Sequence, residues 1–176
     1  MARRIARSLA LSVSLAAVLA VGAACHNAKG PAAASARPLA AVWADVLNQR
    51  DAIHAIMVKE LEAVTHQDCA DLGADGRQVD ALLTELTAAI AADKTQTEGH
   101  LRALGDVLTR VSQAVQKIRE SALAEAPGMW VKLRFPFDQS LRDVETYFTP
   151  EQLGGESVVR RPGFEMTPPP AGLSPI

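Results

Sequence analysis

The strongest constraint on the fold is a heptad pattern of apolar residues between residues 101 and 122. The pattern consists of Leu101, Leu104, Leu108, Val111, Val115, Ile118 and Ala122, which follow one another in steps of three and four. Such steps place side chains on one face of an α-helix, and more than three heptads are typical of a helix that packs along its whole length. Pro127 and Gly128 end the pattern. The sequence therefore predicts a long helix with one buried face.

Three further stretches between residues 39 and 148 have the same helical spacing of apolar residues. We predict helices over residues 39–66 and 77–93, separated by a loop at Gly73 and Gly76, and a last helix that ends near Phe148. The apolar positions of these helices are Trp43, Val46, Leu47, Ile53, Met57, Leu61 and Val64; Val79, Leu82, Leu83, Leu86 and Ile90; and Trp130, Leu133, Phe137, Leu141, Val144 and Phe148.

Two boundaries allow alternative interpretations. The last helix either continues through Pro136 with a kink or begins at Pro136, which is a favoured first residue of a helix. Between the second and third helices, Thr95 and Glu98 form a capping-box pattern. No proline interrupts that stretch, so a single continuous helix of about fifty residues is the alternative.

Charge favours separate, antiparallel helices. Acidic residues gather around the end of the first helix, whereas basic residues gather around the end of the third helix and the start of the fourth. An up-down-up-down bundle brings these two regions to the same end, where opposite charges attract. We therefore predict an all-α fold, an antiparallel four-helix bundle over residues 39–148. The acidic set is Glu60, Glu62, Asp68, Asp71, Asp75 and Asp80, and the basic set is Lys117, Arg119, Lys132 and Arg134.

Residues 1–25 have the order of an export signal. Three arginines precede a charge-free apolar run over residues 8–21, and Gly22, Ala23 and Ala24 then lead to Cys25. This stretch, and no other part of the chain, resembles the signal peptide and lipobox of bacterial prolipoproteins. The resemblance implies that residues 1–24 are removed and that Cys25 carries acyl chains such as palmitate. Because His26 follows Cys25, it also implies an outer-membrane lipoprotein that faces the periplasm.

Two other fates of this segment stay open. Ordinary cleavage after Ala23 or Ala24 would give an exported protein without an anchor, and an uncleaved segment would act as a membrane helix. If Cys25 is acylated, Cys69 is left as a buried thiol or as a partner in an intermolecular disulfide. If Cys25 is not acylated, it could form a disulfide with Cys69.

The segments on either side of the predicted bundle lack helical spacing. We predict that residues 25–38 form a tether and that residues 149–176, which are rich in proline, form a disordered tail. Removal of residues 1–24 leaves 15 basic and 20 acidic residues, a net charge near −5. An acidic chain has no electrostatic attraction to nucleic acid, so we predict no such partner.

Candidate sites are few. The densest set of potential metal ligands is His66, Asp68, Cys69, Asp71 and Asp75, although their spacing matches no zinc or copper motif and suits a solvated turn equally well. Val131 and Phe135 point away from the apolar face of a continuous last helix and have basic neighbours, which is typical of a docking surface for a protein partner. If the helix begins at Pro136, Phe135 instead turns inward.

Arg50 interrupts the apolar face of the first helix. Its side chain either covers the core with its charged group in water or forms a buried pair with an acidic residue of the last helix, Asp138 or Asp143. No serine has a histidine and an acidic residue at catalytic spacing, and no cofactor motif is present. We expect no cofactor and no enzymatic activity, but a binding or scaffold component of the cell envelope. The alternative is a periplasmic ligand- or metal-sensing bundle that uses a loop over residues 66–75.

Overall fold

A computed structural model describes residues 37–93 and 96–164, which belong to one compact unit of the chain, residues 35–176. The regular secondary structure in these ranges is helical. The α-helices are α1 (Leu39–Met57), α2 (His66–Ala92), α3 (Glu98–Leu123) and α4 (Trp130–Glu145), and the short 3-10 helices are η1 (Leu61–Ala63), η2 (Pro127–Met129) and η3 (Val158–Arg160). Cys25, the predicted signal peptide and nearly all of the predicted tether lie outside the described residues.

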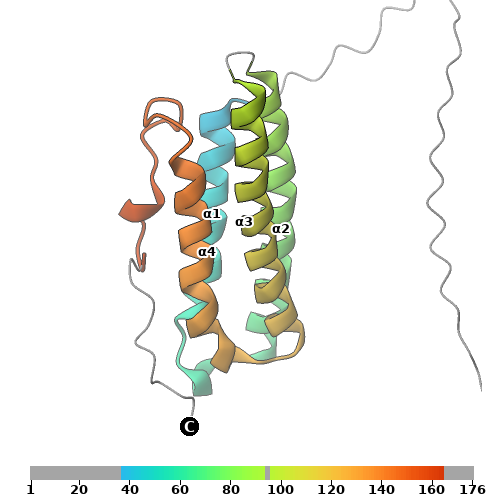
Figure 1. Ribbon diagram of the computed structural model, residues 1–176. Helices are drawn as coiled ribbons and strands as arrows, with labels where there is room; N and C mark the ends of the chain where they lie inside the picture. The colour runs from blue at the N-terminus through green and yellow to red at the C-terminus, as the bar shows by residue number, and fades with distance from the viewer. Residues whose placement is uncertain (1–36, 94–95, 165–176) are drawn as a thin grey trace, which may run out of the picture. The chain divides into compact units, whose positions relative to one another are not determined.

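The four α-helices form an antiparallel up-down-up-down bundle, as the sequence predicts (Figure 1). Consecutive helices pack along their lengths, and α1 and α4 contact each other less extensively. The α1–α2 and α3–α4 connections lie at the same end of the bundle, the lower end in Figure 1. None of the helices in the described ranges is both long and apolar enough to span a bilayer.

The core contains most of the predicted apolar positions. Each of the four helices buries its stripe, and Trp43, Trp130 and Phe137 are the largest apolar side chains that are fully enclosed. On α3 the heptad pattern is buried from Leu104 to Ala122, whereas Leu101, in the first turn, is 37% exposed. Val107 of α3 is also buried, although it lies outside the heptad pattern. A helix that packs against two neighbours buries more than two residues of each heptad.

The predicted boundary between the first two helices is wrong. Helix α1 ends at Met57 and not at residue 66, and α2 begins at His66 and not at residue 77. The reason is a capping box: the Thr65 hydroxyl accepts a hydrogen bond from the Asp68 backbone N–H (3.2 Å), and the Asp68 carboxylate accepts one from the Thr65 N–H (2.9 Å). These contacts satisfy two backbone donors that the first turn of α2 would otherwise leave unpaired.

Gly73 and Gly76 therefore lie inside α2 and do not form a loop. Gly76 is buried where α2 and α3 approach closely. A Cβ atom at this position would lie 2.5 Å from Cγ of Arg119 on α3, and Arg119 is itself held by an ion pair with Asp80 of α2 (2.6 Å). The glycine thus allows a close approach of the two helices and does not mark a helix end.

The two open boundaries are resolved by local hydrogen bonds. Helices α2 and α3 are separate, and the Thr97 hydroxyl caps α3 by accepting a hydrogen bond from the His100 N–H (3.3 Å). The predicted cap, Thr95, lies outside the described residues. Helix α4 begins at Trp130 and continues through Pro136, so a start at Pro136 is wrong. Its buried face, which includes Phe137, Leu141 and Val144, stays in phase on the C-terminal side of the proline.

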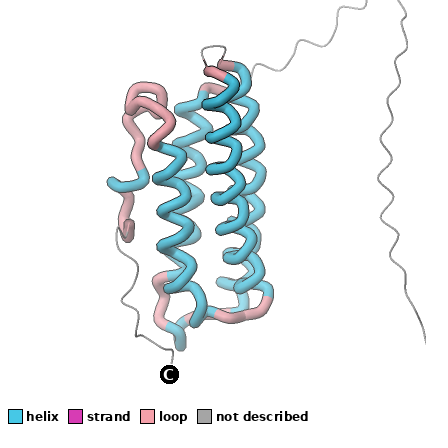
Figure 2. The backbone as a smooth tube through the Cα atoms, in the orientation of Figure 1, coloured by secondary structure: helices cyan, strands magenta, loops and turns pink. Residues whose placement is uncertain are grey.

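The predicted disordered tail is wrong for residues 149–164, here called the C-terminal segment. This segment runs beside α4, mostly as loop with the single turn of η3 (Figure 2). Leu153 and Val158 are buried in the bundle core. Gly154, Gly155 and Gly163 have positive φ angles that residues with side chains rarely adopt, so they let the segment turn back along the helices. The remaining residues of the predicted tail, 165–176, lie outside the described residues.

The capping box at the start of α2 gives a pH-dependent contribution to stability. Asp68 also pairs with Lys59 (2.6 Å), and this contact together with the Thr65 hydrogen bonds lowers the pKa of Asp68 to about 2. A carboxyl group with a lowered pKa in the folded state stabilises above its ordinary value near 4 and loses that contribution as the pH falls towards 2.

We therefore predict that Asp68→Asn lowers the melting temperature at neutral pH by several degrees, and that this difference shrinks as the pH is lowered from 4 to 2. Thermal unfolding followed by circular dichroism measures both effects. Asp71→Asn is the matched control, since the Asp71 carboxylate accepts a hydrogen bond from Gln67 on the same exposed turn and caps nothing. A pH-independent loss in Asp68→Asn would contradict this account.

Candidate functional site

The most enclosed polar group of the described chain is a cluster around Arg50, on the inner face of α1. The Arg50 guanidinium is fully buried and makes two hydrogen bonds to the carboxylate of Asp138 on α4, from Nε (2.8 Å) and Nη2 (2.7 Å). Its Nη1 atom donates to Asp51 (2.9 Å) and to the backbone carbonyl of Pro162 (2.6 Å). The interpretation that keeps the charged group of Arg50 in water is thus wrong, and the alternative, a buried pair, is formed with Asp138 and not with Asp143.

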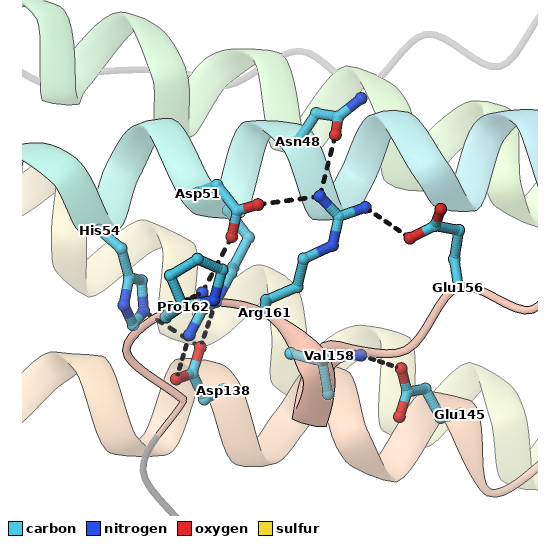
Figure 3. A network of polar contacts seen from close by, with 10 residues as sticks. Asn48, Asp51, His54, Asp138, Glu145, Glu156, Val158, Arg161 and Pro162 are labelled. Carbon is cyan, nitrogen blue, oxygen red and sulfur yellow. Dashed lines mark hydrogen bonds and ion pairs between the residues drawn. The ribbon is translucent and has the colours of Figure 1, made fainter.

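His54 completes the cluster one turn further along α1. Its Nε2 atom lies 3.0 Å from Oδ1 of Asp138 (Figure 3). Burial alone would raise the pKa of Asp138, but hydrogen bonds from His54 and Arg50 outweigh burial and hold this pKa below its ordinary value. Asp138 is therefore a buried carboxylate that keeps its charge, and α1 and α4 share that charge.

The C-terminal segment covers this cluster and is held by charges from both helices. Arg161 donates to Asn48 (3.1 Å) and Asp51 (2.9 Å) of α1 (Figure 3). On the other side, Glu145 of α4 accepts hydrogen bonds from the Val158 N–H and from the Ser157 hydroxyl (3.1 Å). Burial raises the pKa of Glu145 in spite of these hydrogen bonds. The segment is therefore joined to both helices through polar contacts as well as through its two core residues.

The chemistry of this cluster is that of a structural clamp. Arg50, His54 and Asp138 are all buried, and the segment ending at Gly163 lies over them, with Gly163 so close that a Cβ there would be 3.5 Å from Nδ1 of His54. The donors of Arg50 already have oxygen acceptors from α1, α4 and the C-terminal segment. The geometry fixes the relative positions of three elements and presents no reactive group to solvent.

The metal-ligand candidates are not brought together. Residues 66–75 form the first turns of α2 and not a loop, so helical spacing turns His66 and Cys69 away from the face that Asp68, Asp71 and Asp75 share. Asp68 is used in the capping box, and His66 lies 2.7 Å from Glu125 at the end of α3. In the part of the chain that the structure describes, no three His, Cys, Asp or Glu residues are arranged to hold a metal ion.

Cys69 lines a shallow groove between α2 and α3. The groove has a volume of about 640 Å³ and is also lined by Gly73, Arg77, Arg119 and Leu123. Cys69 is a free, buried thiol, and burial, together with the nearby charges of Glu125 and Asp68, raises its pKa. A protonated, buried thiol is a poor nucleophile and a poor metal ligand, which agrees with the simpler interpretation of Cys69 as a core residue.

Val131 and Phe135 lie outside the core, as expected for a continuous α4. Val131 is 47% exposed, and Phe135 is half-buried in a second groove, of about 310 Å³, between α3 and α4. Lys117 and Arg110 of α3 also line this groove, and Arg110 is paired with Asp143 (3.4 Å). The alternative in which Phe135 turns into the core is therefore wrong.

A larger exposed apolar surface was not predicted from the sequence. Five of the seven large apolar side chains that are exposed in the described residues lie at the end of the bundle that holds the α1–α2 and α3–α4 connections. We call this set the apolar end; it consists of Val58 (56% exposed), Leu61 (58%), Leu123 (88%), Met129 (47%) and Val131 (47%). The predicted place of Leu61 on the apolar stripe of the first helix is wrong, because α1 ends at Met57 and Leu61 lies in η1. Periodicity did place Val131 outside its stripe, but Val58, Leu123 and Met129 lie beyond or between the stripes, where it gives no signal. Their apolar character within connecting segments is the one signal that could have indicated this surface.

Comparison with other proteins adds no assignment to these sites. The chain matches no protein-family model, and neither the curated proteins nor the solved structures include one with detectable similarity to it.

The buried pair predicts a large and specific loss of stability. Arg50→Met leaves the Asp138 carboxylate buried without its main partner, and we expect the free energy of unfolding to fall by about 3–5 kcal/mol. Replacing both residues, as Arg50→Met/Asp138→Leu, removes the uncompensated charge and should recover much of that loss. Urea unfolding followed by circular dichroism measures both variants.

Arg110→Met is the matched control, because its pair with Asp143 is partly exposed and its loss should cost no more than about 1 kcal/mol. An equal loss in the control, or a double variant no more stable than Arg50→Met alone, would show that the buried pair is not the stabilising feature.

Proposed function

We propose that this protein is an exported lipoprotein of the bacterial cell envelope that acts by binding another protein and performs no chemistry of its own. The proposal of a lipid anchor is supported by residues 1–25, which have the order of residues found in an export signal. In this proposal Cys25 is the residue that carries the lipid. Two or three acyl chains on one cysteine hold a protein at a membrane essentially permanently. The outer membrane, with the bundle facing the periplasm, is the location we propose.

The observation that carries the binding role is the apolar end of the bundle. A folded domain rarely leaves large apolar side chains exposed together unless another surface covers them. Leu123 is almost fully exposed although it directly follows Ala122, which is buried. Val131 belongs both to the apolar end and to the pair predicted from the sequence, and Phe135, one turn further along α4, extends the same surface into the α3–α4 groove.

The polar cluster of Arg50, His54 and Asp138 supports a non-catalytic role in a different way. These are the most buried charged and titratable side chains of the described residues, and Arg50 and Asp138 make their hydrogen bonds within the protein. The exposed groups at the apolar end are aliphatic side chains and surface charges, which suit recognition better than catalysis.

The lipid anchor is tested with the full-length precursor in a bacterial host. We expect incorporation of labelled palmitate into the wild-type chain and its loss in Cys25→Ala, because acylation of this thiol attaches the lipid. Cys69→Ala is the matched control and should be labelled normally, since Cys69 is buried. Labelling that persists in Cys25→Ala would contradict a lipid anchor at this residue.

The binding surface is tested by site-specific photo-crosslinking in cells. A photoreactive residue in place of Leu123 should give discrete protein adducts, whereas the same residue in place of Arg102, which is exposed in the first turns of α3 at the opposite end, should give none. Adding Val131→Glu and Phe135→Glu should reduce the adducts from position 123, because burying an unpaired charge opposes binding. Equal adducts from positions 123 and 102 would rule out a specific surface at the apolar end.

A further inference from the structure

The charged residues that have no ion pair differ in sign between the two sides of the apolar end. On the α1–α2 side, Glu60 and Glu62 lie next to Val58 and Leu61, whereas on the α3–α4 side Lys132 lies next to Val131. Within residues 37–93 and 96–164, Glu60, Glu62 and Lys132 are all exposed and form no ion pair. Of the other charged residues in the two connections, Lys59 pairs with Asp68, and the Glu125 carboxylate lies 2.7 Å from His66. We call the α1–α2 side, with Glu60 and Glu62, the acidic half and the α3–α4 side, with Lys132, the basic half, after the charges that have no ion pair in the described residues.

A surface of this kind is complementary to itself. In a dimer with twofold symmetry, the same surface is used by both copies, and each residue meets a different residue of the partner. If the acidic half of one copy lies on the basic half of the other, Glu60 and Glu62 of each copy lie near Lys132 of the other copy. Twofold symmetry makes this contact occur twice. The alternative register places like charges together, which opposes association.

The apolar residues fit the same register. Leu61 and Val58 of one copy would cover Met129 and Val131 of the other, and Leu123 would be enclosed between them. Exposed apolar area is the main favourable term in such an association, at roughly 25 cal/mol for each Å² removed from water. Charge complementarity contributes mainly to specificity, because it favours one partner and one orientation, and it contributes less to affinity.

We propose that the apolar end is the contact surface between two copies of this chain, arranged so that the α1–α2 connection of each copy faces the α3–α4 connection of the other. This inference rests on the proposed binding function and names the partner. A lipid surface fits the same end less well, because Glu60 and Glu62 would be repelled by anionic headgroups. A different protein would need its own matching pattern of charge, for which the chain gives no indication.

The test uses full-length chains in cells, with engineered cysteines in a Cys69→Ala background. One chain carries Glu60→Cys and a second, differently tagged chain carries Lys132→Cys; a membrane-permeant thiol oxidant is added before the gel is run without reductant. The proposed register brings position 60 of one copy next to position 132 of the other. Because a disulfide forms only between Cα atoms less than about 7 Å apart, we expect at least about tenfold more linked dimer from the two chains together than from either alone.

Two matched variants show whether the apolar contact is responsible. Leu123→Glu, introduced into both chains, should abolish the linked dimer without unfolding the bundle, since Leu123 packs little against its own chain. Leu101→Glu is a similar change at the opposite end and should leave the yield unchanged. Circular dichroism of each purified variant checks that its helical content is that of the wild-type chain.

Several results would overturn the inference. Equal linking when either cysteine chain is expressed alone would show a different register, and linking no higher than from Arg102→Cys would show that the apolar end is not a dimer contact. Flotation with vesicles of anionic phospholipid that requires Leu123, with no linked dimer, would assign the surface to a membrane. Photo-crosslinking of position 123 to another protein, again with no linked dimer, would overturn the dimer while leaving the proposed binding function intact.

Discussion

The buried contact between Arg50 and Asp138 holds together the elements that meet at the α1–α4 side of the bundle. Removing a guanidinium and a carboxylate from water costs several kcal/mol for each ion, and their attraction offsets this only when the remaining donors also find acceptors. Here those acceptors come from Asp51 on α1 and from the backbone carbonyl of Pro162. The pair is therefore satisfied only when α1, α4 and the C-terminal segment are all in place. It specifies one register for the three elements.

Helices α1 and α4 contact each other less than the other neighbouring helices do, and the C-terminal segment has hydrogen bonds to both of them. The C-terminal segment lies along both helices and buries Leu153 and Val158 in the core that they share. Two buried apolar residues are a small core contribution for a stretch of sixteen residues. The contacts of Arg161 with α1 and of Glu145 with the Val158 N–H supply the specificity that the apolar residues alone do not.

The sequence predicted what depends on local periodicity and missed what depends on distant partners. Apolar spacing identified the helix faces. The arginine within the stripe of α1 left a charged group in water and a buried pair with Asp138 or Asp143 as alternatives, and only the distant contact with Asp138 decides between them. The start of α2 was missed because glycine was taken as a helix end, whereas the Thr65–Asp68 capping box decides the boundary. The C-terminal segment was missed because its partners, such as Asp51 for Arg161, lie about a hundred residues earlier in the chain. The spacing of apolar residues along the sequence gives no indication of contacts between residues so far apart.

The α1–α4 side of the bundle and the apolar end differ in how they treat charged and apolar side chains. At the α1–α4 side, charges are buried and satisfied by their own chain, and apolar side chains such as Val158 are enclosed. At the apolar end, the opposite holds: Leu123 and Leu61 are exposed, and Glu60, Glu62 and Lys132 lack ion-pair partners within the described residues. Apolar side chains and unpaired charges of both signs are the components of a recognition surface. The fold leaves them together at one end, whereas it buries and pairs the charges of Arg50 and Asp138 at the α1–α4 side, and this difference is the basis of the association that we propose through the apolar end.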